Sequence, residues 1–130
     1  MKELNLIKLH CDDNNSVMVF NTASIMAIDM NSGSTTLYMN DSNEWSCNET
    51  TTKIHQMIGD TGFIRAHSKE TNYICLFNMF YLQTITRDES FDTTHINLRC
   101  GEEEIEISVN ETPEKLYNII EETKKKMLKA

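Results

Sequence analysis

The sequence has few of the residues that break regular structure: one proline and four glycines in 130 residues. Disordered chains are poor in apolar residues, but 39% of the residues in this chain are hydrophobic. No stretch approaches the roughly 20 apolar residues that cross a bilayer, and the first ten residues, MKELNLIKLH, lack the apolar centre of a secretion signal. We therefore expect one folded body that stays in the cytoplasm, without a membrane partner.

Positive charge is also scarce. The chain has 12 Lys and Arg residues against 20 Asp and Glu residues, which gives a formal net charge of -8. Affinity for nucleic acids comes largely from Lys and Arg neutralising phosphates. A nucleic-acid partner is therefore possible but disfavoured by the net charge.

Motifs of known chemistry are missing as well. Cys11, Cys47, Cys75 and Cys100 form neither a CxxC pair nor a cluster with His, which favours reduced, buried thiols and no metal site. The sequence contains no nucleophile elbow, P-loop, HExxH or dinucleotide fingerprint. We therefore expect a protein that is not an enzyme and that needs no cofactor.

An internal repeat is the strongest pattern in the chain. Ile7-Lys8-Leu9-His10 is similar to Ile64-Arg65-Ala66-His67, and at the same offset of 57 residues Val17 to Asn21 is similar to Ile74 to Asn78. The Asn-Glu-Thr triplet at 48–50 recurs at 110–112. Such self-similarity indicates a duplicated unit. We predict a first repeat at 1–60 and a second at 61–130 within a single folded unit.

Each repeat is predicted to hold five short strands and a closing helix, because β-branched and alternating apolar runs are separated by polar clusters. The first repeat has expected strands at 6–10, 17–22, 24–30, 35–39 and 44–47, a turn at 12–16 and a helix that begins near Asn48 or Thr50 and ends at Gly59. The second has expected strands at 63–67, 73–78, 80–86, 95–99 and 104–109, and a helix that begins at Pro113.

These elements predict an α+β, mainly β fold with two pseudo-symmetric βββββα repeats packed as one compact body. Apolar stripes on the helices, at Ile54, Met57 and Ile58 in the first, are expected to face the sheets. One short helix covers only part of a five-stranded sheet, so we expect the repeats to pack about an approximate two-fold axis. Spare sheet edges would then favour a homodimer.

The candidate ligand-binding residues are polar residues that occur in both repeats. Lys8 and His10 share one face of a strand by alternation, and Arg65 and His67 share the equivalent face. These pairs either hold an anion or serve the strand ends structurally, and the second is favoured. Asn21 and Asn78 recur where one strand hands over to the next, and their expected role is again mainly structural.

Two families are similar to this sequence. At the level of each half, the sequence resembles the small FlbD-type proteins of flagellar operons and their phage and gut-bacterial relatives. In the first half the resemblance is carried by Ile-Lys-Leu-His at 7–10, Val-Met-Val-Phe-Asn at 17–21, Ile25, Ile28, Thr36, Leu37 and Glu49. That resemblance implies two tandem copies of a small interaction module. Gly62-Phe63-Ile64-Arg65-Ala66-His67 resembles the Phe-x-Arg-x-His signature of the LytTR DNA-binding domain. That resemblance implies that His67, and less directly Asn78, contact DNA, although the segment from His67 to Asn78 is longer than in that family.

Three functions remain open from the sequence. The favoured one is a non-catalytic module, bacterial or phage-related, that binds itself or another protein. The alternatives are a LytTR-like DNA-binding transcriptional regulator and a protein that binds or sequesters a small anionic ligand such as a nucleotide.

Overall fold

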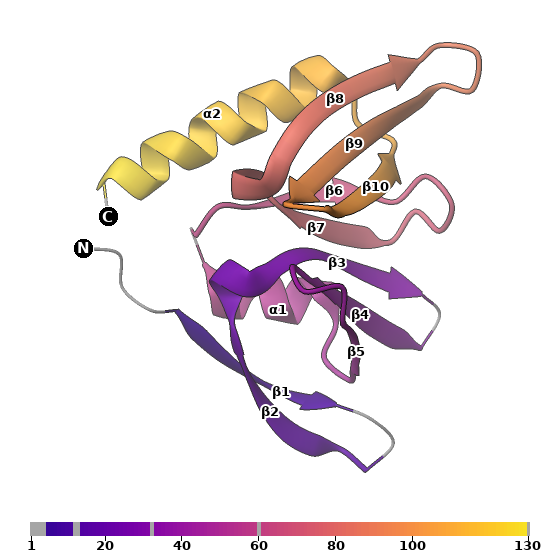
Figure 1. The fold of residues 1–130 in the computed structure, drawn as a ribbon. Coiled ribbons are helices and arrows are strands. Elements are labelled where there is room, and N and C mark those ends of the chain that lie inside the picture. The colour runs from indigo at the N-terminus through magenta and orange to yellow at the C-terminus, as the bar shows by residue number, and fades with distance from the viewer. Residues whose placement is uncertain (1–4, 12–13, 32, 60, 130) are drawn as a thin grey trace.

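The computed structural model describes residues 5–11, 14–31, 33–59 and 61–129 and confirms the mainly β prediction (Figure 1). The first half holds β1 (Leu6–Cys11), β2 (Ser16–Asn21), β3 (Ile25–Asn31), β4 (Ser34–Met39), β5 (Glu44–Cys47) and α1 (Thr51–Ile58). The second half holds β6 (Phe63–His67), β7 (Ile74–Asn78), β8 (Leu82–Asp88), β9 (Thr93–Cys100), β10 (Glu103–Val109) and α2 (Pro113–Lys129). The order of five strands and a helix therefore occurs twice. Asp12 and Asp13 of the expected first turn lie outside the described residues.

Local sequence signals explain where these elements begin and end. The Thr50 hydroxyl accepts a hydrogen bond from the Lys53 amide at the start of α1, and Gly59 ends that helix with a φ of 69°. Such an N-cap satisfies an otherwise unpaired amide, and glycine adopts a positive φ without strain. The sequence predicts a strand from Phe80. Instead Phe80 lies in a short 3-10 helix, Met79–Tyr81, because the Asn78 side chain accepts a hydrogen bond from the Phe80 amide.

The strands form a seven-stranded sheet, in the order β2-β1-β5-β4-β3-β7-β6, and a three-stranded sheet, in the order β10-β9-β8. Neighbouring strands in both sheets run antiparallel, and a single bridge from Ser68 to Val109 joins the end of β6 to β10. The two halves thus follow one another along a nearly continuous row of strands. Figure 1 shows β1 and β2 at one end of this row and β8 at the other.

The prediction of a two-fold arrangement of the halves was wrong. The halves meet where β3 pairs with β7, with Ala27 opposite Phe77 and Ile28 opposite Leu76. β3 is the third strand of its half, and β7 is the second strand of its own. A two-fold axis would match this contact with a second one between β8 and β2, the equivalent strands, but these are terminal strands of different sheets. The junction is therefore head-to-tail.

Two clusters of buried side chains form the interior. The first lies between α1 and the strands around it and includes Leu9, Ile28, Ile54 and Leu76. The second lies under α2 and is built by these buried residues: Met26, Ala27, Ile64, Ala66, Cys75, Phe77, Ile96, Leu98, Val109, Leu116 and Ile120. Met26 and Ala27 of the first half belong to the second cluster, so the junction shares one interior.

The first cluster differs from the sequence prediction at one helix position. Met57 is predicted to lie on the buried stripe of α1, but its side chain is 42% exposed, while Ile54 and Ile58 are buried. Ile54 and Ile58 are four residues apart, which places both on the same side of a helix. α1 therefore buries a narrower stripe than its sequence suggests.

No helix in the described residues is long and apolar enough to cross a membrane.

Candidate functional site

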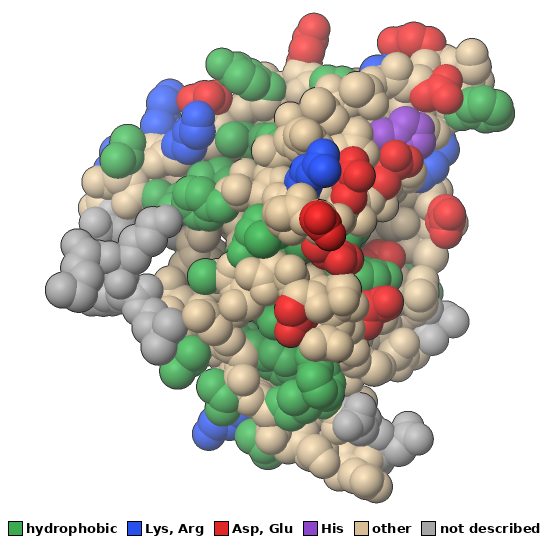
Figure 2. All heavy atoms as spheres, in the orientation of Figure 1, with side chains coloured by type: hydrophobic (Ala, Val, Ile, Leu, Met, Phe, Trp, Pro, Cys, Tyr) green, Lys and Arg blue, Asp and Glu red, His purple; other side chains and the backbone are tan. Residues whose placement is uncertain are grey.

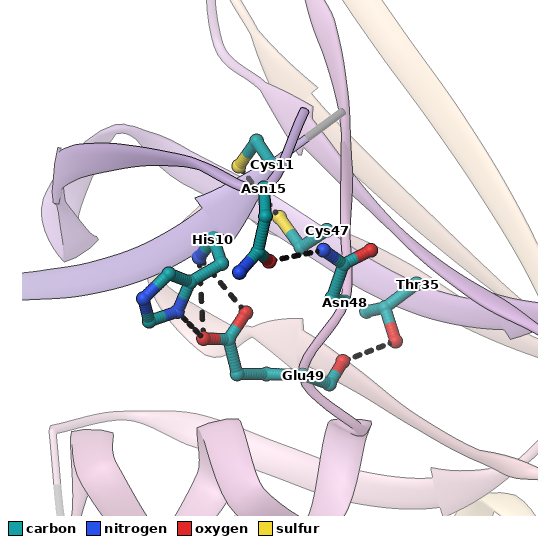
Figure 3. Close-up of polar contacts among 7 residues, drawn as sticks. All are labelled: His10, Cys11, Asn15, Thr35, Cys47, Asn48 and Glu49. Atoms are coloured by element: carbon teal, nitrogen blue, oxygen red, sulfur yellow. Dashed lines mark hydrogen bonds and ion pairs between the residues drawn. The ribbon is translucent and has the colours of Figure 1, made fainter. Parts of the chain in front are cut away.

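His10 and Glu49 form a paired site at the end of β1 (Figure 3). The His10 backbone N–H donates to the Glu49 carboxylate, with nitrogen-to-oxygen distances of 3.0 and 3.2 Å, and the ring Nδ1 lies 2.7 Å from Oε2. The histidine side chain is 43% exposed, whereas that of the glutamate is 7% exposed. The carboxylate is thus buried beneath a half-exposed imidazole.

His67 and Glu111 form the same arrangement in the second half. The His67 backbone N–H donates to Oε1 at 2.9 Å, and Nδ1 lies 2.6 Å from Oε2. The exposed fractions are again 43% for the histidine and 7% for the glutamate. Two separate stretches of the chain therefore build one geometry.

Hydrogen bonds decide the ionisation of both carboxylates. Burial raises the pKa of each glutamate, but the hydrogen bonds from the histidine ring and backbone N–H outweigh burial. The net pKa of Glu49 and of Glu111 is lowered from the ordinary 4.5. Both groups are therefore carboxylates at neutral pH. They accept from Nδ1–H, which fixes the ring orientation and points Nε2 away from the carboxylate.

A pair of asparagines stands beside each His–Glu pair. The side-chain amide of Asn48 donates to the side-chain oxygen of Asn15 at 2.6 Å. Likewise, the side-chain amide of Asn110 donates to the side-chain oxygen of Asn72 at 3.0 Å. Asn15 and Asn72 have φ values of 57° and 60°, a left-handed conformation that asparagine tolerates better than most residues. These contacts tie each hairpin turn to the segment that leads into the helix.

The structure does not bring the two predicted basic–histidine pairs together. Lys8 and Arg65 are exposed, each on the same strand face as its histidine, but β1 and β6 are separated by four strands. At about 4.8 Å per strand step, the pairs lie on the order of 24 Å apart along the sheet. The two pairs would therefore bind two separate small ligands rather than share one.

The two predicted asparagines are the last residues of β2 and β7, and each caps the short 3-10 helix that follows its strand. The Asn21 side-chain oxygen accepts from the Ala23 amide at 3.0 Å, and that of Asn78 accepts from the Phe80 amide at 3.1 Å. Asn78 is buried, and its amide also donates to the Ile25 carbonyl at 3.0 Å. Asn78 thereby links the two halves.

A polar groove borders the second His–Glu pair. Two adjoining hollows share His67 and Asn72, and we call them together the His67 groove. The start of each helix lines one hollow, and the full lining is Met30, Thr50, Thr51, Thr52, His67, Asn72, Tyr73, Ile74, Asn110, Glu111, Thr112 and Lys115. Peptide dipoles leave partial positive charge at a helix N-terminus. The groove therefore combines a histidine, a lysine and two helix starts.

Sequence reasoning missed the partners of the histidines. Glu49, Glu111, Asn15 and Asn72 were not predicted as site residues. The available signal was the repeated Asn-Glu-Thr triplet together with an asparagine 57 residues after Asn15. A triplet shared by two repeats marks a common structural need, but its contact with a residue 39 positions away is visible only in the fold.

The whole chain resembles one solved DNA-binding domain in fold. A LytTr DNA-binding domain from Bacillus cereus superposes with a TM-score of 0.59 at 10% sequence identity, over 94% of this chain and 97% of that domain. The chain has a LytTr-type fold. No protein-family model and no curated protein matches the sequence. The FlbD-type resemblance therefore stays a prediction, and the LytTr-type resemblance is supported at the level of the fold.

Proposed function

We propose that this chain is a non-catalytic module that binds DNA, as a LytTR-like regulator does. The observation that carries the proposal is the similarity in fold to a LytTr DNA-binding domain over nearly the full length of both chains. The similarity extends over 94% of this chain rather than over one motif. The proposal includes a location in the cytoplasm, where such a module meets DNA.

The His67 groove is the proposed contact surface for a phosphate backbone. Its lining includes Lys115 and the starts of both helices, and the exposed Arg65 lies on the same strand face as His67. Backbone amides at helix starts and cationic side chains are the usual phosphate ligands in DNA-binding proteins. The acidic residue of the lining, Glu111, is buried and bonded to His67.

The net charge of -8 sets the expected strength of binding. Figure 2 shows acidic side chains gathered over β10 and the strands beside it, so the charge is unevenly distributed over that face. With roughly two to four phosphates contacted, the logarithm of affinity should fall with the logarithm of salt with a slope of about -2 to -4. We expect weak non-specific binding that is detectable at low salt, and tighter binding to a selected sequence.

Fluorescence anisotropy with labelled duplex DNA tests the proposal. Duplexes enriched from a random library would first define the preferred sequence. The Arg65→Ala, Lys115→Ala double variant should weaken binding by more than about tenfold, because a cation that no longer neutralises a phosphate no longer releases its counterion. The salt slope should become shallower by about 2.

A variant matched in charge provides the control. Lys8→Ala with Lys125→Ala also removes two exposed cations, but four strands separate Lys8 from β6, and Lys125 lies towards the C-terminal end of α2, away from the helix start that lines the groove. This control should bind within about twofold of the unmodified protein. Equal weakening by both variants would show a general charge effect. No binding at low salt would reject the proposed function.

The same groove also suits a small anion, the second candidate function. A phosphate group at His67 and Lys115 would use the same helix starts as a DNA backbone. A thermal shift with nucleotides or inorganic phosphate in the absence of DNA would favour this candidate, and Lys115→Ala should abolish the shift. A shift with DNA alone would favour the first.

We further propose that the two halves descend from one duplicated segment, with repeats at 1–60 and 61–130. Contacts recur at the predicted offset: the Thr22 amide donates to the Asn5 carbonyl at 2.9 Å, and the Met79 amide donates to the Gly62 carbonyl at 2.9 Å. The register of strand pairing is also interrupted at matching places, after Ile25 and after Leu82. These repeated irregularities support a common origin more strongly than the strand order alone.

A further inference from the structure

The two strands that join the halves have counterparts elsewhere in the chain, and these counterparts each have an unpaired edge. β3 pairs with β7 inside the chain, and the repeat makes β8 the counterpart of β3 and β2 the counterpart of β7. β8 and β2 are both terminal strands of their sheets. Figure 1 places them at opposite ends of the molecule, so they do not pair with each other in one chain.

We propose that β8 of one molecule pairs with β2 of a second copy of this chain and repeats the internal junction. The internal register places Ile28 opposite Leu76 and Ala27 opposite Phe77. At the offset of 57 residues, Ile85 would lie opposite Val19 of the second copy, and Thr84 opposite its Phe20. The partner is thus specified by a contact that the chain already makes with itself.

Apolar side chains at the internal junction are more deeply buried than their counterparts on the two free edges. Ile28 and Leu76 are fully buried there. Their counterparts differ: Val19 is 59% exposed, and Ile85 is half-buried. Pairing with a second copy would remove this apolar surface from water, which is the main driving force for association.

α2 provides the cover that the new junction needs. Inside the chain, Leu76 packs in the same cluster as Ile54 and Ile58 of α1. The residues that correspond to these two in α2 are Leu116 and Ile120, and both are buried. Beside them, a groove next to β8 is lined by Ile85, Pro113, Glu114, Tyr117 and Asn118. The side chain of Val19 from a second copy would enter this groove.

β2 also lacks the usual protection of an edge strand. Its sequence, Ser-Val-Met-Val-Phe-Asn, contains no charged residue and no proline. Edge strands in monomeric proteins are commonly guarded by lysines, prolines or bulges. The exposed side chains of Val17 and Val19 instead present a strand that is ready to pair.

A contact between unlike edges has a geometric consequence. Each molecule offers one β8 edge and one β2 edge, so a bound pair still carries one free edge of each kind. Association of this type continues into a ring or an open filament and does not stop at a symmetric dimer. The expected species therefore grow in size with protein concentration.

Sedimentation velocity on nuclease-treated protein, in salt high enough to displace DNA, tests this proposal. The unmodified chain should form species that enlarge with concentration. Val19→Lys should weaken association by more than about tenfold, because a charge would replace a buried apolar side chain at the centre of the contact. Leu128→Lys, which changes an 86% exposed residue outside both edges, should leave association unchanged.

A mixing experiment distinguishes unlike edges from a symmetric contact. Ile85→Glu blocks the β8 edge, and Thr84→Lys blocks it at an exposed position if the first substitution disturbs folding, as judged by circular dichroism. Each blocked chain alone should stay monomeric, whereas an equal mixture of a β2-blocked and a β8-blocked chain should give a pair. A monomer at every concentration, or a dimer formed by either blocked chain alone, would overturn the proposal.

Discussion

The Glu111 carboxylate accepts two hydrogen bonds from His67. The backbone nitrogen of His67 lies 2.9 Å from Oε1, and its ring Nδ1 lies 2.6 Å from Oε2. The same carboxylate thus satisfies the strand backbone and holds the imidazole ring. Since Glu49 does the same for His10, both halves rely on a buried carboxylate where the first strand meets the segment before the helix. This relationship governs both the stability of the fold and the orientation of His67 in its groove.

Replacing either carboxylate should destabilise the protein. Glu49→Gln and Glu111→Gln each weaken a charge-assisted acceptor that is buried, at an expected cost on the order of 1–3 kcal/mol in the free energy of unfolding. Urea denaturation monitored by circular dichroism measures this cost. Glu104→Gln, at an exposed position of β10, should change stability by less than about 0.5 kcal/mol. Equal effects at all three positions would contradict a special role for the buried pair.

Stability should depend on pH through the same two groups. The pKa of each glutamate is lowered in the folded state from the ordinary 4.5, so the unfolded chain binds protons more readily. Their contribution is therefore complete above pH 4.5 and is lost as the pH falls through the lower folded-state pKa. The stability difference between the unmodified protein and the double Gln variant should shrink on acidification below that value. The pKa values of carboxyl groups in folded proteins reach down to roughly 2–3. A stability difference that stays constant down to that pH would therefore contradict the lowered pKa values.

The left-handed asparagines should distinguish backbone strain from hydrogen bonding. Asn72→Gly keeps the positive φ accessible but removes the bond from Asn110, whereas Asn72→Ala loses both. We expect a cost of about 0.5–1 kcal/mol for the glycine variant and of about 1–2 kcal/mol for the alanine variant. The same order should hold at Asn15, where φ is 57°. Thermal unfolding of the four variants makes the comparison, and an alanine variant as stable as the glycine variant would argue against strain.

The four thiols should differ in reactivity. Cys11, Cys47 and Cys75 are buried, and burial raises the pKa of the Cys75 thiol to about 12. Cys100 is partly exposed. A thiolate is the reactive species, so a maleimide or an alkylating reagent should label Cys100 first in the native protein. Peptide mass spectrometry reads the labelled positions, and labelling in denaturant gives the full count. Early labelling of Cys75 would show local opening of the second cluster.

The sequence by itself determined the local structure and the repeat. Alternating apolar residues predicted β1 to β10, and Thr50, Gly59 and Pro113 marked the helix ends, because these signals act through neighbours in the chain. Lys8, His10, Arg65 and His67 were recognised as repeated polar residues for the same reason. The carboxylates that hold the histidines were not, since Glu111 is 44 residues from His67.

Only the tertiary structure decided how the halves are joined and where the polar residues lie. Periodicity defines the two faces of a strand but not its neighbours, so the pairing of β3 with β7 had no signal in the sequence. That pairing places His67 between the starts of two helices and leaves four strands between the strands of Lys8 and Arg65. The physical reason is that strand pairing and shared burial are long-range choices, settled by which edges leave the least apolar surface in water.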